Sequence, residues 1–322
     1  MNTSSDIRTF IVNAESSGTR LDVFLAEYTG LSRSQIKNLI SGGHSEIENG
    51  KPPKPSYQVE AGDIIKIAIP ELEEPNFLPE NIPLDIVYED NHIAVVNKPS
   101  GMVVHPGRGN VSGTMASGLL YHFKSLSEVG EKFRPGIIHR IDMDTSGLLV
   151  VALSIYTHGI LSKMIQKREI KRMYTAVVWG HPDPEEGTID APIGRHPVKG
   201  ILRAVIPSGR NAVTHYKLTE RFEFLSKLSI TLETGRTHQI RVHLAHIGHH
   251  VFGDPNYGGR EERLKGFSPE IRLTAKKLLT IIDRQALHAE RLEFMHPVTG
   301  QELSFKAPIP DDMSKLLTAL GK

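Results

Sequence analysis

Residues 134–153 have the sequence RPGIIHRIDMDTSGLLVVAL. Two isoleucines, Ile137 and Ile138, precede a polar cluster, and an apolar run at residues 148–153 follows it. Glycine lies on both sides of the cluster, so the pattern predicts a buried strand, an exposed polar loop and a second buried strand. Because rigid scaffolds often carry functional residues on such loops, the polar cluster is a candidate site.

Two interpretations of the cluster are open at this point. Asp, Thr and Ser beside glycine are common in turns, because their side chains hydrogen-bond to the nearby backbone. In the second interpretation, Asp142 or Asp144 is a catalytic carboxylate. The neighbouring side chains of His139 and Arg140 favour the second interpretation, since catalytic carboxylates lie among other charged and titratable groups.

With His139 and Arg140, the cluster resembles the catalytic motif of the RluA-type pseudouridine synthases, His-Arg-Leu-Asp-x-x-Thr-Ser-Gly. The resemblance implies that Asp142 is the catalytic residue. It also implies that Arg140 fills the space left by a flipped-out base and that His139 helps to hold the flipped conformation. Ile141 and Met143 replace the family's common leucine and a basic residue. The first change is mild, whereas the second removes one phosphate contact.

Further segments match motifs of the same family, in the same order. Residues 172–180, RMYTAVVWG, resemble the second motif, which implies that Tyr174 contacts the target base. Without the resemblance, a tyrosine in a strand is better interpreted as a core residue. Residues 235–241, GRTHQIR, imply that Arg241 pairs with the catalytic aspartate, and GDPNYG at residues 253–258 continues the pattern.

A basic cluster follows the central segment, with five cations and one acid in residues 163–172. Apolar residues at roughly helical spacing predict a helix at residues 155–168 that packs one face on the sheet. A charge cluster is usually a solvated surface, but beside the proposed site it is equally well explained as an RNA backbone contact. Lys167 and Arg168 are the candidate contact residues.

Four histidines in one short segment suggest a metal site, since histidine is the commonest ligand of transition metals; they are His243, His246, His249 and His250. The segment lacks the His-Glu-x-x-His arrangement of zincins, and the chain has no cysteine. Gly248 is expected to end the helix before the last two histidines. We therefore expect no metal and no cofactor, and the family motif accounts for the segment better.

Residues 18–70 have a pattern of their own. Ser32 and Gln35 have the spacing of a capping box for one helix, and Thr19 is expected to cap an earlier helix. The run GDIIKIAI at residues 62–69 predicts a closing strand. This order predicts a compact module of two short helices and a small sheet.

The module resembles the S-four-type RNA-binding domain of ribosomal proteins and some tRNA synthetases. The resemblance implies that Arg20, Arg33 and Lys37 contact RNA phosphates. For any single one of these residues, a solvated charge on a helix face is the simpler interpretation. Residues 1–70 are therefore expected to form an RNA-binding domain.

A proline-rich, acidic run at residues 70–83, PELEEPNFLPENIP, follows this module. Such a composition is typical of an extended, semi-rigid linker. We place the linker at residues 71–83 and the catalytic domain at residues 84–322.

Composition limits the classes of protein that fit. The chain has 322 residues, of which 39% are hydrophobic, and no apolar run is long enough to cross a bilayer. Its first residues lack the apolar core of a secretory signal. These features predict a cytoplasmic monomer that does not bind membranes. Because the net charge is only +1, local basic patches must bind any RNA partner.

Many strands alternate with few helices, which predicts an α+β fold with a mixed, mainly antiparallel, curved sheet around a central cleft. The resemblance implies the pseudouridine synthase fold, preceded by the small α+β RNA-binding module. It further implies isomerisation of uridine to pseudouridine in structured RNA, with large-subunit ribosomal RNA, in the pre-ribosomal large subunit, as the expected partner. In this reaction the bond between N1 and ribose breaks, the uracil rotates, and C5 is joined to the ribose.

Two other classes of protein share some of these sequence features. A glycosidase would need a pair of carboxylates such as Asp142 and Asp144, one of them with a raised pKa, and the arginine-rich surroundings argue against that. A non-catalytic RNA-binding protein of ribosome assembly is the stronger alternative, because the front module would bind RNA without any chemistry.

Overall fold

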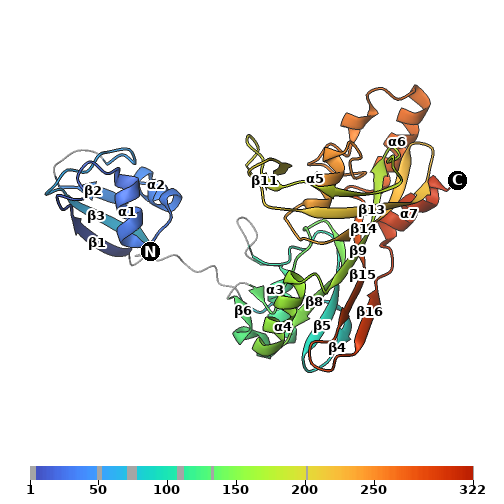
Figure 1. The fold of residues 1–322 in the computed structure, drawn as a ribbon, viewed down its shortest axis with the longest axis horizontal. Helices are drawn as coiled ribbons and strands as arrows, with labels where there is room; N and C mark the ends of the chain where they lie inside the picture. Colours follow the sequence, from blue (N-terminus) through green and yellow to red (C-terminus); the bar gives the residue numbers. More distant parts are fainter. Residues whose placement is uncertain are drawn as a thin grey trace. The chain divides into compact units, whose positions relative to one another are not determined.

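The computed structural model describes residues 5–48, 53–70, 78–106, 112–131, 134–200 and 202–321. The chain divides into two compact units, Met1–Asn76 and Phe77–Lys322, which are called unit 1 and unit 2 below (Figure 1). The boundary falls inside the expected linker at residues 71–83. Residues 71–77 of that linker lie outside the described residues.

Unit 1 combines a small antiparallel sheet with two helices. Its described elements are β1 (Ser5–Ile11), α1 (Leu21–Thr29), α2 (Arg33–Ser41), β2 (Ser45–Ile47) and β3 (Ile64–Pro70). The strands lie in the order β1-β3-β2. Buried side chains of the helices, such as Phe24 and Ile36, pack with Ile65 and Ile67 of β3 and form the core of this unit.

The helix starts of unit 1 match the sequence prediction in one case and differ in the other. Ser32 forms the predicted capping box with Gln35 at the start of α2. The prediction that Thr19 caps α1 is wrong, because the N-cap is Arg20 and no side chain caps this helix. The Thr19 carbonyl instead accepts a hydrogen bond from the Val59 backbone N–H, which ties this stretch to the segment before β3.

Unit 2 is built on one large sheet with helices around it. Its strands are β4 (Asp85–Glu89), β5 (Ile93–Lys98), β6 (Gly130–Glu131), β7 (Arg134–Pro135), β8 (Ser146–Ala152), β9 (Lys171–Trp179), β10 (Glu186–Asp190), β11 (Ile193–Arg195), β12 (Arg203–Val205), β13 (Val213–Arg221), β14 (Leu225–Leu232), β15 (Leu287–Met295) and β16 (Glu302–Lys306). Its helices are α3 (Met115–His122), α4 (Ile155–Gln166), α5 (Gln239–His246), α6 (Pro269–Ile281) and α7 (Asp311–Leu320), with short 3₁₀ turns at Lys124–Glu128 and Glu261–Leu264.

Within the described residues, nine strands of unit 2 form one sheet in the order β10-β13-β14-β9-β15-β8-β5-β4, with β16 paired to β15. Only the β15–β8 pair among these is parallel, so the predicted mixed, mainly antiparallel sheet is confirmed. In Figure 1, α3 and α4 lie beside the half of the sheet that contains β5 and β8, and α5 and α6 lie beside the half that contains β13. None of the helices within the described residues is long and apolar enough to cross a membrane.

The strand β8 lies in the middle of the sheet and is buried along its whole length. Leu149 and Val151 belong to the larger hydrophobic core of unit 2, whereas Leu148 and Val150 belong to a second core. Since successive side chains of a strand point to opposite faces, β8 is covered on both faces of the sheet. This explains why its sequence is continuously apolar rather than alternating.

The segment before β8 differs from the sequence prediction in two respects. The predicted strand at Ile137 and Ile138 is wrong, because these two residues contribute an isolated β-bridge, between Ile137 and Val151, and no strand. The prediction of an exposed loop is also wrong for much of the cluster. His139, for example, is only 9% exposed, and Thr145 is 2% exposed.

Three side chains from distant segments bury this loop by binding its polar groups. Lys98 donates to the Met143 carbonyl at 2.8 Å, and Arg284 donates to the Asp144 carbonyl at 3.0 Å. Gln285 donates to the Thr145 hydroxyl at 3.1 Å. The loop is therefore held rigidly, although it has no regular secondary structure.

Candidate active site

Asp142 contacts Arg241 in a small pocket of unit 2 that both residues line. The Arg241 Nη1 atom donates to Asp142 Oδ2 at 3.1 Å, although the two residues are 99 positions apart in the chain. The Arg241 side chain is 4% exposed and that of Asp142 is 16% exposed. The structure thus brings together the two residues for which the resemblance implied a pair.

Asp254 holds Arg241 in place from the other side. Arg241 Nε donates to Asp254 Oδ2 at 2.7 Å, and Nη2 donates to Oδ1 at 2.8 Å. Burial by itself lowers the pKa of Arg241, but the hydrogen bonds and charge of Asp254, aided by Asp142, outweigh burial and raise it. Arg241 is therefore a fixed positive charge, and its Nη1 group, which Asp254 does not engage, is directed at Asp142.

His238 lines this pocket, and Tyr257 packs against both His238 and Arg241. His238 precedes α5 in the left-handed conformation, with a φ of 59°, and its Nε2 atom lies 4.0 Å from Asp142 Oδ1. The Tyr257 hydroxyl lies 2.7 Å from His238 Nδ1 and accepts a hydrogen bond from the Arg203 backbone N–H. Because that acceptor role leaves the phenolic hydrogen free for Nδ1, the other ring nitrogen, Nε2, can carry its proton toward Asp142.

Tyr174 lines the same pocket, which has a volume of about 40 Å³ and is also lined by Asp142, Arg140, Arg172 and Arg241. Tyr174 lies on β9 and is 5% exposed. Burial raises the pKa of its phenol, so the ring stays neutral. A neutral aromatic ring beside a carboxylate and a guanidinium can contact a planar base while the carboxylate reacts with it or with its sugar.

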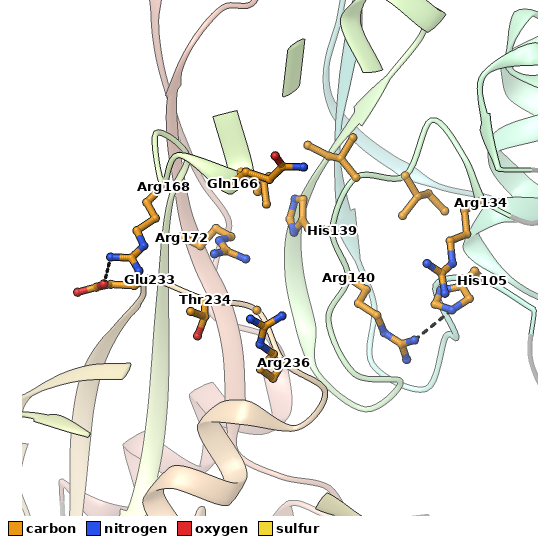
Figure 2. Close-up of a pocket in the computed structure, with 14 residues that line it drawn as sticks. His105, Arg134, His139, Arg140, Gln166, Arg168, Arg172, Glu233, Thr234 and Arg236 are labelled. Atoms are coloured by element: carbon orange, nitrogen blue, oxygen red, sulfur yellow. Dashed lines mark hydrogen bonds and ion pairs between the residues drawn. The ribbon is translucent and has the colours of Figure 1, made fainter. Parts of the chain in front are cut away.

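His139 and Arg140 have different surroundings. The His139 ring is buried, and its Nε2 atom accepts a hydrogen bond from the Val150 backbone N–H at 3.1 Å. Burial, followed by the charge of Arg172, lowers the pKa of His139 to about 3. Arg140 is exposed and donates to His105 Nε2 at 3.0 Å (Figure 2).

A second and larger pocket, of about 470 Å³, adjoins the Asp142 pocket. Both pockets are lined by Arg140, Arg172, Gly235 and Arg236, which therefore form the boundary between them. Figure 2 shows several arginines around the larger pocket. We call it the arginine pocket.

The candidate contact residues at the end of α4 are not equivalent. Arg168 lines the arginine pocket and forms an ion pair with Glu233, whereas Lys167 is exposed and lines neither pocket. Arg168 has a φ of 63°, a conformation that is strained for any residue except glycine. The predicted helix at residues 155–168 ends earlier, at Gln166, and Ile155 at its start is 65% exposed rather than packed on the sheet.

The candidate RNA contacts of unit 1 converge on one buried carboxylate. Asp22 accepts hydrogen bonds from Arg20 at 2.9 Å and Arg33 at 3.1 Å, and Lys37 lies 3.6 Å away. The hydrogen bond from Arg20, opposed by burial and supported by Arg33, lowers the pKa of Asp22 to about 2. All three cations remain partly exposed, so they can still meet a phosphate.

Three of the four histidines at residues 243–250 are engaged separately, and the fourth, His246, is exposed. His243 bonds to the Thr214 hydroxyl and the Ala191 carbonyl, His249 to the Trp179 carbonyl and His250 to the Tyr257 carbonyl. In the part of the chain that the structure describes, no group of three or more His, Cys, Asp or Glu side chains could hold a metal ion.

Sequence reasoning gave no role to Asp254, His238 or Tyr257, all of which lie within quoted family-like segments. A buried arginine needs an acidic partner, so Asp254 could have been predicted from the sequence as a partner of Arg241. Arg172 was seen only as one cation of a basic cluster, although it lines both pockets. Its inward position could not be inferred from charge alone.

Comparison with known proteins connects this geometry to a family. A model of the RNA pseudouridylate synthase family matches residues 92–246, and a model of the S4 domain matches residues 19–65. The ribosomal large subunit pseudouridine synthase D of Escherichia coli (strain K12) is 45% identical over 313 residues, covering 97% of this chain and 94% of that protein. The synthase of the same name from Vibrio cholerae is 44% identical over 304 residues, covering 94% and 91%.

Solved structures show the same fold. Human RNA Pseudouridylate Synthase Domain Containing 4 has a TM-score of 0.57 at 24% identity, covering 73% of this chain and 92% of that chain. Human RNA Pseudouridylate Synthase Domain Containing 1 has a TM-score of 0.53 at 25% identity, covering 75% and 96%. Because the family model matches residues 92–246 and both bacterial synthases are at least 44% identical over more than 90% of this chain, the chain belongs to the RNA pseudouridylate synthase family.

Proposed function

We propose that this protein converts specific uridines of large-subunit ribosomal RNA to pseudouridine, with Asp142 as the catalytic carboxylate. The observation that carries the proposal is the Asp142–Arg241 contact in a pocket lined by Tyr174. The bacterial relatives named above support the ribosomal target, because their names specify the ribosomal large subunit.

The reaction redistributes atoms within one nucleotide. The bond between N1 and C1′ breaks, a bond between C5 and C1′ forms, C5 loses its proton and N1 gains one. Asp142 can act as a nucleophile on the ribose or on the base, or as a base toward a ribose proton. In each route, Arg241 stabilises the negative charge of the carboxylate and fixes its orientation.

The surrounding residues then have separate roles. A base within a folded RNA must leave its stack before it reaches Asp142, at a cost of a few kcal/mol. Arg140 would fill the space that the base leaves, after it separates from His105, and Tyr174 would contact the base in the pocket. His139 supports this segment through its hydrogen bond with Val150.

Chemical mapping of pseudouridines in ribosomal RNA tests the proposal directly. In cells that lack this gene, one or more pseudouridines of the large-subunit RNA should be missing, and the wild-type gene should restore them. Asp142→Asn should fold but fail to restore them, since the amide is nearly isosteric but neither nucleophilic nor basic. The matched control is Asp144→Asn, which should restore them because Asp144 lines neither pocket.

An unchanged map in the deletion strain, or restoration by Asp142→Asn, would contradict the proposal. Release of tritium from uridine labelled at C5 separates an enzyme from a non-catalytic RNA-binding protein, because only the reaction removes that atom. The proposal includes no cofactor, so protein dialysed against EDTA should release tritium at an unchanged rate. Inhibition that added zinc reverses would point instead to a histidine metal site.

Unit 1 would supply additional RNA affinity through Arg20, Arg33 and Lys37, as expected for an S4 domain. Residues 1–70, 71–83 and 84–322 would then be the RNA-binding domain, the linker and the catalytic domain. We also propose that the protein acts as a monomer in the cytoplasm. Light scattering of the purified chain at micromolar concentration tests the oligomeric state.

A further inference from the structure

Arg172 is a buried arginine that the proposed chemistry does not use. It is 6% exposed, lies on β9 two residues before Tyr174, and lines both the Asp142 pocket and the arginine pocket. Within the described residues, Arg172 forms no ion pair, and its Nε atom has no hydrogen-bond partner. A buried charge without a partner is costly, so Arg172 needs a negative group that the described residues do not provide.

The arginine pocket has the charge of an anion site. Five arginines line it, and Glu233 is the one carboxylate among its lining residues. Glu233 is already engaged by Arg168 and by His215, whose Nε2 atom lies 2.8 Å away. Arg236, at the boundary with the Asp142 pocket, is exposed, and within the described residues its guanidinium donates through Nε to the Asn211 carbonyl alone.

Gly235 leaves the room that the Arg172 side chain occupies. A Cβ atom at Gly235 would lie 3.0 Å from Arg172 Nη1, closer than most real Cβ contacts. The backbone of Gly235 is not in the left-handed region, so its lack of a side chain is explained by this close approach rather than by its conformation. Gly235 therefore allows the guanidinium of Arg172 to lie beside the boundary of the two pockets.

We propose that Arg172 and Arg236 bind the backbone phosphate next to the uridine that enters the Asp142 pocket. This inference rests on the proposed function, which supplies the RNA. The planar fork of an arginine suits a phosphate, and two such forks at the mouth of a narrow pocket would fix the sugar-phosphate backbone on one side of the reacting nucleotide. Arg172 is thus a positioning residue for the substrate.

A contact between Arg172 and the uracil itself would explain the burial of Arg172 equally well. It would not explain the other arginines that line the arginine pocket. The Asp142 pocket is small, at about 40 Å³, whereas Arg172 and Arg236 also face about 470 Å³ of arginine-lined space. That space is within the usual size range of ligand pockets. Its charge matches a phosphate rather than a neutral base.

The experiment measures RNA binding by the full chain carrying Asp142→Asn, so that the RNA is not converted. The probe is a stem-loop of large-subunit RNA around one mapped target uridine. In a series of such RNAs, one linkage at a time is replaced by an uncharged methylphosphonate. Parent protein, Arg172→Met, Arg172→Lys and the control Lys277→Met, an exposed cation that lines neither pocket, are compared.

We expect one linkage adjacent to the target uridine at which the methylphosphonate weakens binding by the parent about tenfold. Arg172→Met should bind the unmodified RNA about tenfold more weakly and lose less than about twofold at that same linkage. Arg172→Lys should fall between the two, since it keeps the charge but not the fork. Lys277→Met should respond to every linkage as the parent does.

Equal sensitivity of the parent and Arg172→Met at every linkage would overturn the proposal, even if their affinities differ, because a merely structural role predicts that result. If Arg172→Met fails to fold, Gly235→Ala provides the same comparison by displacing the guanidinium. The readout is binding, so it is distinct from turnover. The two proposals can therefore fail separately. If the wild-type protein forms no pseudouridine but its sensitivity to one linkage depends on Arg172, the proposed function is contradicted and the phosphate site is supported.

Discussion

Arg241 and Asp254 form a bidentate ion pair that is almost completely buried. The Nε–Oδ2 and Nη2–Oδ1 distances are 2.7 Å and 2.8 Å. The pair does not use Nη1 of Arg241, which donates to Asp142. Asp254 itself does not line the Asp142 pocket. It contacts Asp142, the proposed catalytic carboxylate, only through Arg241, so we propose that Asp254 is a positioning residue.

Asp254→Asn should consequently lower kcat by about tenfold to a hundredfold, because small displacements of a catalytic group cost rates of that order. KM should change little, since Asp254 does not touch the substrate pocket. The free energy of unfolding should fall by about 3 kcal/mol, as a buried ion pair loses one charge. Steady-state kinetics well below the melting temperature check the first two effects. Exposed Asp283→Asn is the control, and a change confined to KM would contradict the positioning role.

Buried neutral histidines should make unit 2 sensitive to mild acid. Burial lowers the pKa of His139 to about 3 and that of His105 to about 4, from an ordinary value near 6.5. Between the folded and unfolded pKa values only the unfolded chain binds the proton. Stability is therefore greatest above about pH 6.5 and falls as the pH drops toward 4, by up to about 1.4 kcal/mol per pH unit for each histidine.

Urea unfolding at pH 7 and pH 5, followed by fluorescence of the buried Trp179, measures this pH dependence. His139→Gln should reduce the difference between the two pH values, because glutamine can accept the hydrogen bond from Val150 but does not titrate. An identical pH difference in His139→Gln and wild type would show that His139 does not contribute.

Lys98 fixes the loop of Asp142 and should be needed for stability. Its side chain is fully buried, and its Nζ atom donates to the carbonyls of Pro99, Met102 and Met143. Lys98→Met keeps the volume but leaves these carbonyls without their donor, so unfolding free energy should fall by about 3 kcal/mol. Urea unfolding checks this, with exposed Lys277→Met as the control. Equal stability of the two variants would contradict the role of Lys98.

Local sequence patterns could predict β8 but not the burial of the loop before it. A continuous apolar run such as residues 148–153 is sufficient to indicate a strand covered on both faces. The hydrogen bonds that bury the preceding polar residues come from Lys98, Arg284 and Gln285, which are distant in sequence. No local pattern encodes such contacts, so the exposed loop was a reasonable but wrong expectation.

The same limit applies to the site. The contact of Asp142 with Arg241 was accessible only through the resemblance, because spacing along the chain carries no information about a pair 99 residues apart. For Arg172, the sequence suggests the wrong environment. Its residue type is that of a solvated cation in a basic cluster, and only the fold reveals that it points inward from β9 and lacks a partner within the described residues.

Unit 1 should increase RNA affinity without affecting chemistry. Residues 77–322 have their own hydrophobic cores and contain every residue around Asp142, so deletion of residues 1–76 should leave turnover of a short stem-loop unchanged. Affinity for long structured RNA should fall, because a tethered second contact acts by raising the effective concentration. Gel-shift titrations at several salt concentrations measure both the affinity and its salt dependence.

The size of the salt effect follows from the ion pairs around Asp22. This buried carboxylate offsets one of the three charges of Arg20, Arg33 and Lys37, so unit 1 should contribute about two net phosphate contacts. Deletion should then reduce the log-log salt slope by about 1.4 to 1.8, at about 0.7 to 0.9 per contact. Arg33→Ala with Lys37→Ala in the full chain should reproduce most of this change. An unchanged slope with undiminished affinity would show that these cations are solvated surface charges and that unit 1 does not bind the RNA.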